Sequence, residues 1–159
     1  MNANTSGRYP ILYVEGKNDL YVICNLLSES GIILSPQDGP VVIDPKDSVD
    51  QVLDIMVIAI KSAVGRCQPV GFVLDIDKDG KARWDGIKSR LREVGCRLSN
   101  SDICDEGVIK DIGNGRVGIW TMPYPKAKSG KLEDFLREIV PVEDKILPLA
   151  KKYIGTVVE

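Results

Sequence analysis

The chain has 159 residues, of which 43% are hydrophobic and 28% are charged, and its 21 basic and 23 acidic residues give a net charge of −2. This size and balance are typical of one globular domain and exclude a histone-like polycation, so any contact with nucleic acid must come from a local basic surface. The sequence has no histidine, which excludes Ser-His-Asp and Cys-His catalysis and leaves chemistry to carboxylates, lysines, hydroxyls and metal ions.

The cysteines and the hydropathy pattern exclude further classes of protein. The four cysteines show no CxxC spacing, which argues against a zinc finger or zinc ribbon. Cys24 and Cys67 lie in apolar stretches, so we expect buried free thiols there. The sequence shows neither a signal peptide nor a long apolar span, and we therefore expect a cytoplasmic protein.

The first third of the chain predicts two strands separated by a helix. The apolar run 11–14 is typical of a buried strand, and residues 19–30 carry apolar side chains at helical spacing. Gly31 follows as a candidate C-terminal cap of that helix. Residues 41–43 then predict a short second strand.

The middle of the chain repeats this alternation of strand and helix. Ser48 and Gln51 form a capping-box pattern that opens a strongly apolar helix over residues 49–64. The run 70–74 predicts a buried strand, and a charged amphipathic helix follows at 82–94.

The last third of the chain predicts a β-hairpin, a basic loop and short helices. Residues 108–120 contain two apolar runs around the Asn-Gly dipeptide at 114–115, which indicates a hairpin turn. A basic loop at 124–131 leads into a short helix at 132–140, and residues 142–159 predict one more helix and a frayed end.

The order of these elements predicts the fold class. Strands that alternate with helices indicate an α/β fold, here one domain over residues 1–159 with a mainly parallel sheet flanked by helices and an added β-hairpin. In such sheets, ligands bind at the carboxyl ends of the strands.

Acidic residues follow two of the predicted strands. Glu15 follows the first strand, and Asp75, Asp77 and Asp79 occupy alternate positions after the strand at 70–74. If these strands are parallel neighbours, Glu15, Asp75 and Asp77 converge at one edge of the sheet, where carboxylates would suit a hard cation such as Mg²⁺. A solvated acidic turn is the alternative for the stretch after 74, and for Asp79 a turn role is at least as well supported as a metal ligand.

A calcium-binding EF-hand loop is excluded by the same stretch. Counting from Asp75, the first six positions fit the loop, but the twelfth is Gly86, where an EF-hand has a bidentate glutamate. A predicted strand precedes the loop, whereas an EF-hand loop follows a helix.

Two segments in order, "ILYVEGKND" and "GFVLDIDKDG", together resemble the Toprim domain. Glu15 matches the glutamate that follows the first Toprim strand, and Asp75 with Asp77 match the Asp-x-Asp pair. Asp19 resembles the additional acid of nuclease-type members. The late segment "GIWTMPYPKAKSGKLEDFL" is similar to the end of small stand-alone Toprim-like proteins related to OLD-family nucleases and ribosomal-RNA maturases. At Tyr124 and Pro125 the chain departs from the Asp-Asn pair that we expect in those relatives.

The resemblance implies a Toprim-like fold and metal-dependent chemistry on phosphodiesters. Mg²⁺ or Mn²⁺ would be held by Glu15, Asp19, Asp75 and Asp77, with Glu15, Asp75 and Asp77 as catalytic residues. We expect a nuclease or a related phosphoryl-transfer protein that acts on DNA or RNA. A topoisomerase is disfavoured because its tyrosine nucleophile lies on a separate domain, and a primase because its zinc module is missing.

Two alternatives to this enzyme remain. One is a non-catalytic Toprim-like subunit that binds nucleic acid or a separate partner ATPase, and the other is a protein that binds divalent ions without catalysis. Basic residues near the predicted site are candidate contacts with nucleic acid, although each taken singly is also explained as a solvated loop charge; they are Lys78, Lys81, Arg83, Lys126, Lys128 and Lys131.

Overall fold

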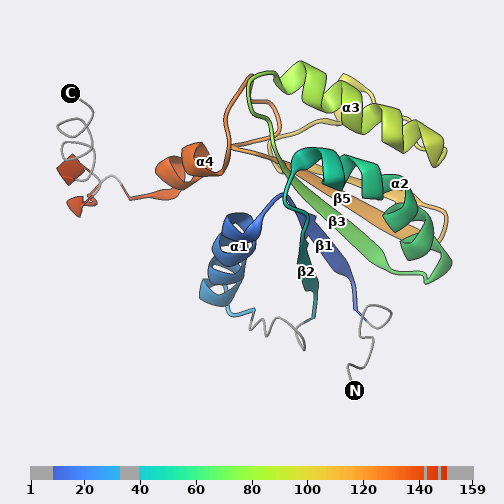
Figure 1. Ribbon diagram of the computed structural model, residues 1–159, viewed down its shortest axis with the longest axis horizontal. Helices are drawn as coiled ribbons and strands as arrows, with labels where there is room; N and C mark the ends of the chain where they lie inside the picture. Colours follow the sequence, from blue (N-terminus) through green and yellow to red (C-terminus); the bar gives the residue numbers. More distant parts are fainter. Residues whose placement is uncertain (1–8, 33–39, 142, 147, 150–159) are drawn as a thin grey trace.

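The computed structural model describes residues 9–32, 40–141, 143–146 and 148–149. In these residues, strands and helices alternate along most of the chain and build one five-stranded sheet with helices on both sides (Figure 1). The elements in chain order are β1 (Ile11–Val14), α1 (Lys17–Glu29), β2 (Val42–Pro45), α2 (Val49–Gly65), β3 (Pro69–Asp75), α3 (Gly80–Glu93), a short 3₁₀ helix (Asn100–Asp102), β4 (Val108–Ile112), β5 (Gly115–Met122) and α4 (Leu132–Ile139).

The sheet is mainly parallel, as the alternation of elements predicts. Its strand order is β2-β1-β3-β5-β4, and only the pairing of β4 with β5 is antiparallel. The predicted α/β class, mainly parallel sheet and added hairpin are therefore confirmed, and the arrangement is consistent with a Rossmann-like fold. Because β1 and β3 are parallel neighbours, their carboxyl ends lie at the same edge.

The alternation of side chains along β1 separates the two faces of the sheet. Tyr13 belongs to the main hydrophobic core with α2 and α3, where its ring stacks on Phe72 with centroids 5.5 Å apart. Leu12 points to the opposite face. There it lines an apolar pocket of about 330 Å³, together with side chains of α1, of the sheet and of Phe135 in α4.

The hairpin turn lies one residue earlier than the Asn-Gly dipeptide predicts. Ile112 pairs with Gly115 across the hairpin, so Gly113 and Asn114 form the turn, with φ of +56° at Gly113. Gly115 belongs to β5, where an added Cβ would lie 3.0 Å from the Cα of Val64. The close packing of α2 against the strand fixes the register, which the dipeptide alone does not.

Local capping at the other elements follows the sequence more closely. The side chain of Ser48 caps α2 by accepting a hydrogen bond of 3.3 Å from the N–H of Gln51, and Gly31 follows α1 with φ of +78°. The expected burial of Cys67 is wrong, because the chain turns there with φ of +53° after α2 and leaves the thiol exposed. Cys24 is partly buried.

The helix expected in 142–159 lies largely outside the described residues. Within the residues that the structure describes, no helix has the length and apolar character needed to cross a membrane.

Candidate active site at the carboxyl ends of β1 and β3

Glu15 and Asp75 meet at the carboxyl edge of the sheet. The parallel register pairs Val14 with Val73, which brings the residue after β1 beside the last residue of β3. The backbone N–H of Asp75 donates a hydrogen bond of 2.7 Å to Oε1 of Glu15. The Oδ1 atom of Asp75 in turn accepts a hydrogen bond of 3.0 Å from the N–H of Leu132, at the start of α4. Three segments that are distant in the sequence therefore form this edge.

The two carboxyl groups titrate near neutral pH. Burial raises the pKa of Glu15 to about 7, although the hydrogen bond from Asp75 and the charge of Arg83 oppose the shift. Burial also raises the pKa of Asp75 to about 7, and the negative charges of Glu15 and Asp19 add to the increase. Desolvation and like charge both disfavour the ionised forms, so the pair favours a bound proton or cation.

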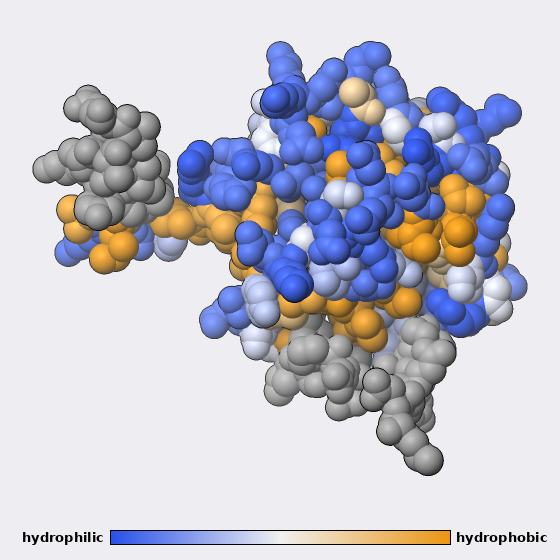
Figure 2. Space-filling model, in the orientation of Figure 1, coloured by the Kyte–Doolittle hydropathy of each residue, from blue (hydrophilic) through white to orange (hydrophobic). Residues whose placement is uncertain are grey.

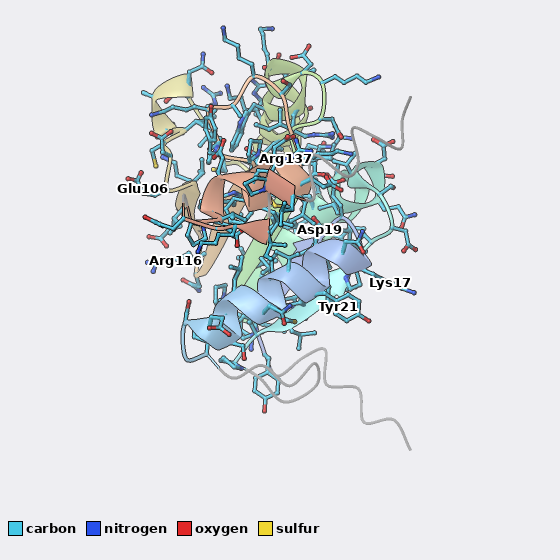
Figure 3. The ribbon with its side chains drawn as sticks, turned by 90° about the vertical axis from the view of Figure 1, so that its left-hand side faces the viewer. Lys17, Asp19, Tyr21, Glu106, Arg116 and Arg137 are labelled. Atoms are coloured by element: carbon cyan, nitrogen blue, oxygen red, sulfur yellow. The ribbon has the colours of Figure 1, made fainter. Side chains whose placement is uncertain are left out.

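Asp19 is the most buried acid near this edge, with 6% of its surface exposed. It lies in the first turn of α1, where its Oδ2 accepts a hydrogen bond of 3.0 Å from the N–H of Gly16. Its Oδ1 is buried and has no hydrogen-bond partner, and burial raises the pKa of the carboxyl. Figure 3 shows Asp19 on the side of α1 that faces α4, whereas Lys17 and Tyr21 project away. The residue thus caps a helix and still has one free acceptor.

Asp77 is held by a basic partner rather than left open. Its Oδ2 forms an ion pair of 2.5 Å with Arg83, and Nε of Arg83 donates a hydrogen bond of 2.7 Å to the carbonyl of Asp75. The backbone of Asp77 exchanges two hydrogen bonds with Gly130, of 2.8 and 2.7 Å. Arg83 is one of the candidate contacts with phosphate. Its side chain is mostly buried, and its bonds to Asp75 and Asp77 hold the acidic loop in place.

The remaining acid of the loop has a structural role. Asp79 is the N-cap of α3, and its Oδ1 accepts a hydrogen bond of 3.0 Å from the N–H of Ala82. Because α3 begins at Gly80, the later positions of a calcium loop would lie in this helix, which agrees with rejecting an EF-hand.

The candidate lysines divide between two hollows, which the acidic loop and the first residues of α3 help to line. The first, of about 510 Å³, is lined by Asp77, Lys78, Ser129, Gly130, Lys131 and Asp134. The second, of about 400 Å³, includes Lys81, Lys126 and Lys128 in its lining, and it also includes Lys88, which sequence reasoning missed.

The loop that departs from the expected Asp-Asn pair packs against α3. Nε1 of Trp84 donates a hydrogen bond of 2.7 Å to the carbonyl of Pro125, which is fully buried. Tyr124 is 41% exposed. The loop therefore supplies lysines and backbone contacts to this region but no carboxylate at 124 or 125.

The acids at this edge offer only part of the ligand set that a divalent cation needs. No three or more His, Cys, Asp or Glu side chains among the described residues form a group arranged to hold a metal ion. The donor chemistry nevertheless suits Mg²⁺ or Mn²⁺, because the carboxylate of Glu15 contacts the backbone of Asp75, its charge acts on the Asp75 carboxyl, and Asp19 has a free buried oxygen. Asp77 fits less well, since Arg83 already neutralises it.

The sequence of the chain is similar to one known protein family. The profile of one family matches residues 9–159, which is nearly the whole chain. The chain belongs to the DUF3226 family. That family is described as proteins of unknown function. Neither the curated proteins nor the solved structures gave a match. The residues that match DUF3226 include the acidic edge and both lysine-lined hollows. Because the family has no described activity, the function has to be inferred from the site.

The pairing of Arg83 with Asp77 and the contribution of Lys88 were not predicted from the sequence, although each carries a signal. Arg83 lies four residues after the N-cap Asp79, so its long side chain can reach back across the first turn of α3. Lys88 lies four residues after Trp84, on the buried face of the same helix. The backbone N–H of Leu132 has no sequence signal, because its position depends on where α4 docks.

Proposed function

We propose that this protein is an Mg²⁺- or Mn²⁺-dependent enzyme that cleaves or transfers phosphodiesters of nucleic acid, with nuclease activity as the simplest form. The single observation that supports this most is the contact of Glu15 with Asp75 at the carboxyl edge of a parallel sheet, where both pKa values are about 7. Strongly raised pKa values in adjacent acids at a ligand-binding edge are typical of catalytic sites. The arrangement also agrees with the Toprim resemblance of the two acidic motifs.

Glu15, Asp19 and Asp75 are the residues that would hold the ion in this proposal. Such an ion supplies a water of lowered pKa and neutralises charge on the phosphoryl oxygens. Asp77 would become a ligand only if its ion pair with Arg83 were broken and replaced by a bond to the ion. In the absence of that exchange, Asp77 and Arg83 keep the loop in place around Asp75.

The side chains themselves perform the other tasks. Where Asp19 and Asp75 alone hold the ion, Glu15 can act instead as a general base, because its pKa of about 7 in the metal-free site lets its carboxylate accept a proton from an attacking water and return it to a leaving oxygen. The N–H of Leu132 fixes the orientation of Asp75. Lys78 and Lys131 line the hollow beside Asp77, and their ammonium groups would hold the phosphate backbone of a substrate.

A second candidate function is a non-catalytic subunit that binds nucleic acid or a partner ATPase. The observation that favours it is the ion pair of Asp77 with Arg83, which removes one of the four expected acids from metal binding. Such a subunit would bind nucleic acid with its lysines and would show no cleavage in any divalent cation.

Cleavage of labelled DNA and RNA by purified protein tests the enzyme proposal. We expect products with Mn²⁺ or Mg²⁺ and none with EDTA, and we expect Asp75→Asn and Glu15→Gln to lower the rate by about 100-fold or more. Asp54→Asn is the matched control, because this acid lies on α2 with its side chain 78% exposed. An equal rate in Asp75→Asn and the wild type would reject the acidic edge as the active site. Binding without cleavage under all conditions would support the non-catalytic subunit.

A further inference from the structure

We infer that the hollow around Lys88 is a second binding site, which takes a phosphate group of a nucleic-acid strand beside the acidic edge. The identity of this ligand as nucleic acid rests on the proposed function, whereas the site itself rests on side chains that no role yet explains. The hollow has a volume of about 400 Å³ and lies between α3, the 3₁₀ helix and the basic loop.

Lys88 is a buried cation without a counter-ion. Only 8% of its surface is exposed, and its ammonium donates a hydrogen bond to Oδ1 of Asn100. Within the described ranges, no ion pair joins Lys88 to an acid. A lysine ammonium has three donors, and burial of an unpaired charge is costly. An anion in the hollow would supply the missing acceptors and the missing charge.

The other side chains of the hollow increase its positive charge. Lys81, Lys126 and Lys128 line it together with Lys88, and Asp85 is the one acid among its lining residues. Lys81 contacts Asp85 at 3.2 Å and Lys126 contacts Asp105 at 3.6 Å, but these pairs are exposed and exchange readily with another anion. The surface over α3 is mainly hydrophilic (Figure 2), as a phosphate-binding surface requires.

The hollow is joined to the acidic loop through the backbone. Gly80 lines the hollow and follows Asp79 directly, and its N–H donates a hydrogen bond of 2.7 Å to the carbonyl of Lys128. A Cβ at Gly80 would lie 2.4 Å from the carbonyl oxygen of Ala127, so no larger residue allows this approach. The basic loop therefore contributes lysines to both hollows, Lys131 to one and Lys126 and Lys128 to the other.

A polyanion suits this distribution better than a single small anion. Cations line one hollow at Lys78 and Lys131 and the other at Lys88 and its neighbours, and the segment 77–81 contributes to the lining of both. A strand with successive phosphates can occupy both hollows, whereas free phosphate fills only one. The ammonium groups of lysine bind phosphate as point charges without demanding one orientation of the strand.

Binding of a fluorescent single-stranded oligonucleotide in EDTA tests the site without any need for cleavage. We expect Lys88→Met to weaken binding about tenfold or more. We also expect it to reduce the slope of log affinity against log salt by about 0.7, the value for one lost contact with a single strand. Lys61→Met, an exposed lysine on α2, is the matched control and should leave both quantities unchanged. Inorganic phosphate should compete with the oligonucleotide on the wild type and much less on Lys88→Met.

The outcomes separate this site from the proposed function. A folded Lys88→Met variant with wild-type affinity and salt slope would overturn the inference, as would a wild type that binds neither the oligonucleotide nor inorganic phosphate. If Lys88→Met does not fold, a variant with Lys126→Ala and Lys128→Ala, two exposed lysines, replaces it, and unchanged binding there also overturns the inference. Phosphate binding that needs Lys88 without oligonucleotide binding would replace nucleic acid by a free phosphate ligand. Binding that depends on Lys88 without cleavage would support this site and reject only the nuclease.

Discussion

At the scale of single residues, the protein places carboxyl groups where their charge is unfavourable. The side chain of Glu15 accepts a hydrogen bond from the backbone N–H of Asp75, both carboxyl groups have a pKa of about 7, and Asp19 is buried with one oxygen unpaired. A fold selected for stability alone would replace such acids by neutral residues. Their retention is explained if the acids bind something, which is the basis of the proposed function.

The raised pKa values of Glu15 and Asp75 should make the stability of the protein depend on pH. In the metal-free protein, Glu15 and Asp75 keep their protons up to about pH 7 when folded, whereas in the unfolded chain they ionise near 4.5 and 3.8. Because the folded state holds more protons between these values, the free energy of unfolding should fall as pH rises from about 4 to about 7. Urea unfolding in EDTA at a series of pH values measures this. Asp75→Asn should flatten the dependence, and an equal slope in that variant would contradict the assignment.

At the scale of elements, the basic loop and α3 depend on one close contact. The backbone of Gly80 approaches Ala127 and Lys128 so closely that a side chain is excluded. Arg83, one turn further along α3, holds the acidic loop by its bonds to Asp75 and Asp77. The start of α3 is therefore the element that positions both the acids and the lysines.

Replacement of Gly80 tests this contact. Gly80→Ala should lower the free energy of unfolding by about 1–3 kcal/mol, because the new Cβ meets backbone atoms that cannot move away cheaply. Gly65→Ala is the matched control, since a Cβ there meets no atom within 4 Å, and it should be neutral or stabilising by up to about 1 kcal/mol. Chemical denaturation of both variants gives the comparison. If Gly80→Ala and Gly65→Ala had equal free energies of unfolding, the basic loop would have to move away from residue 80 at little cost, which would contradict the prediction.

At the scale of the whole molecule, the candidate site exists only because distant segments meet. Glu15 and Asp75 are 60 residues apart, and Asp75 and Leu132 are 57 residues apart. The T-shaped contact of Trp120 with Phe135, with ring centroids 6.2 Å apart, packs α4 against the sheet and so brings the N–H of Leu132 to Asp75. Beyond this contact, Ile139 and Ile146 are exposed, and hydrophobic residues gather where the chain leaves α4 (Figure 2).

Because a ligand of the folded site stabilises the whole fold, metal binding should be visible in melting curves. Mn²⁺ at about 100 times its Kd should add about 2.7 kcal/mol to the free energy of unfolding of the wild type. Asp75→Asn should lose this increase, and its metal-free form should be at least as stable as the wild type, because a repelling charge is removed. Asp54→Asn should keep the full effect of Mn²⁺. Melting curves that Mn²⁺ leaves unchanged in all three proteins would reject the metal site.

The sequence by itself determined the elements and the order in which they occur. Runs of β-branched and aromatic residues predicted β1 and β3, and alternation with amphipathic helices predicted a mainly parallel sheet. That topology was enough to expect Glu15 and Asp75 at one edge, because parallel neighbours end on the same side. The cap at Ser48 was also readable, since a cap involves residues only a few positions apart.

Only the tertiary structure decided how the charges at this edge are shared. Asp77 is paired with Arg83, Asp19 is buried in the first turn of α1, and Lys88 is buried and forms no ion pair with any acid that the structure describes. The hairpin turn lies one residue earlier than the sequence predicts, because Gly115 packs against α2 as part of β5. These outcomes depend on which side chains are desolvated together and on contacts between segments far apart in the chain. Sequence spacing does not encode such contacts, because burial and charge pairing are set by the packing of the whole fold.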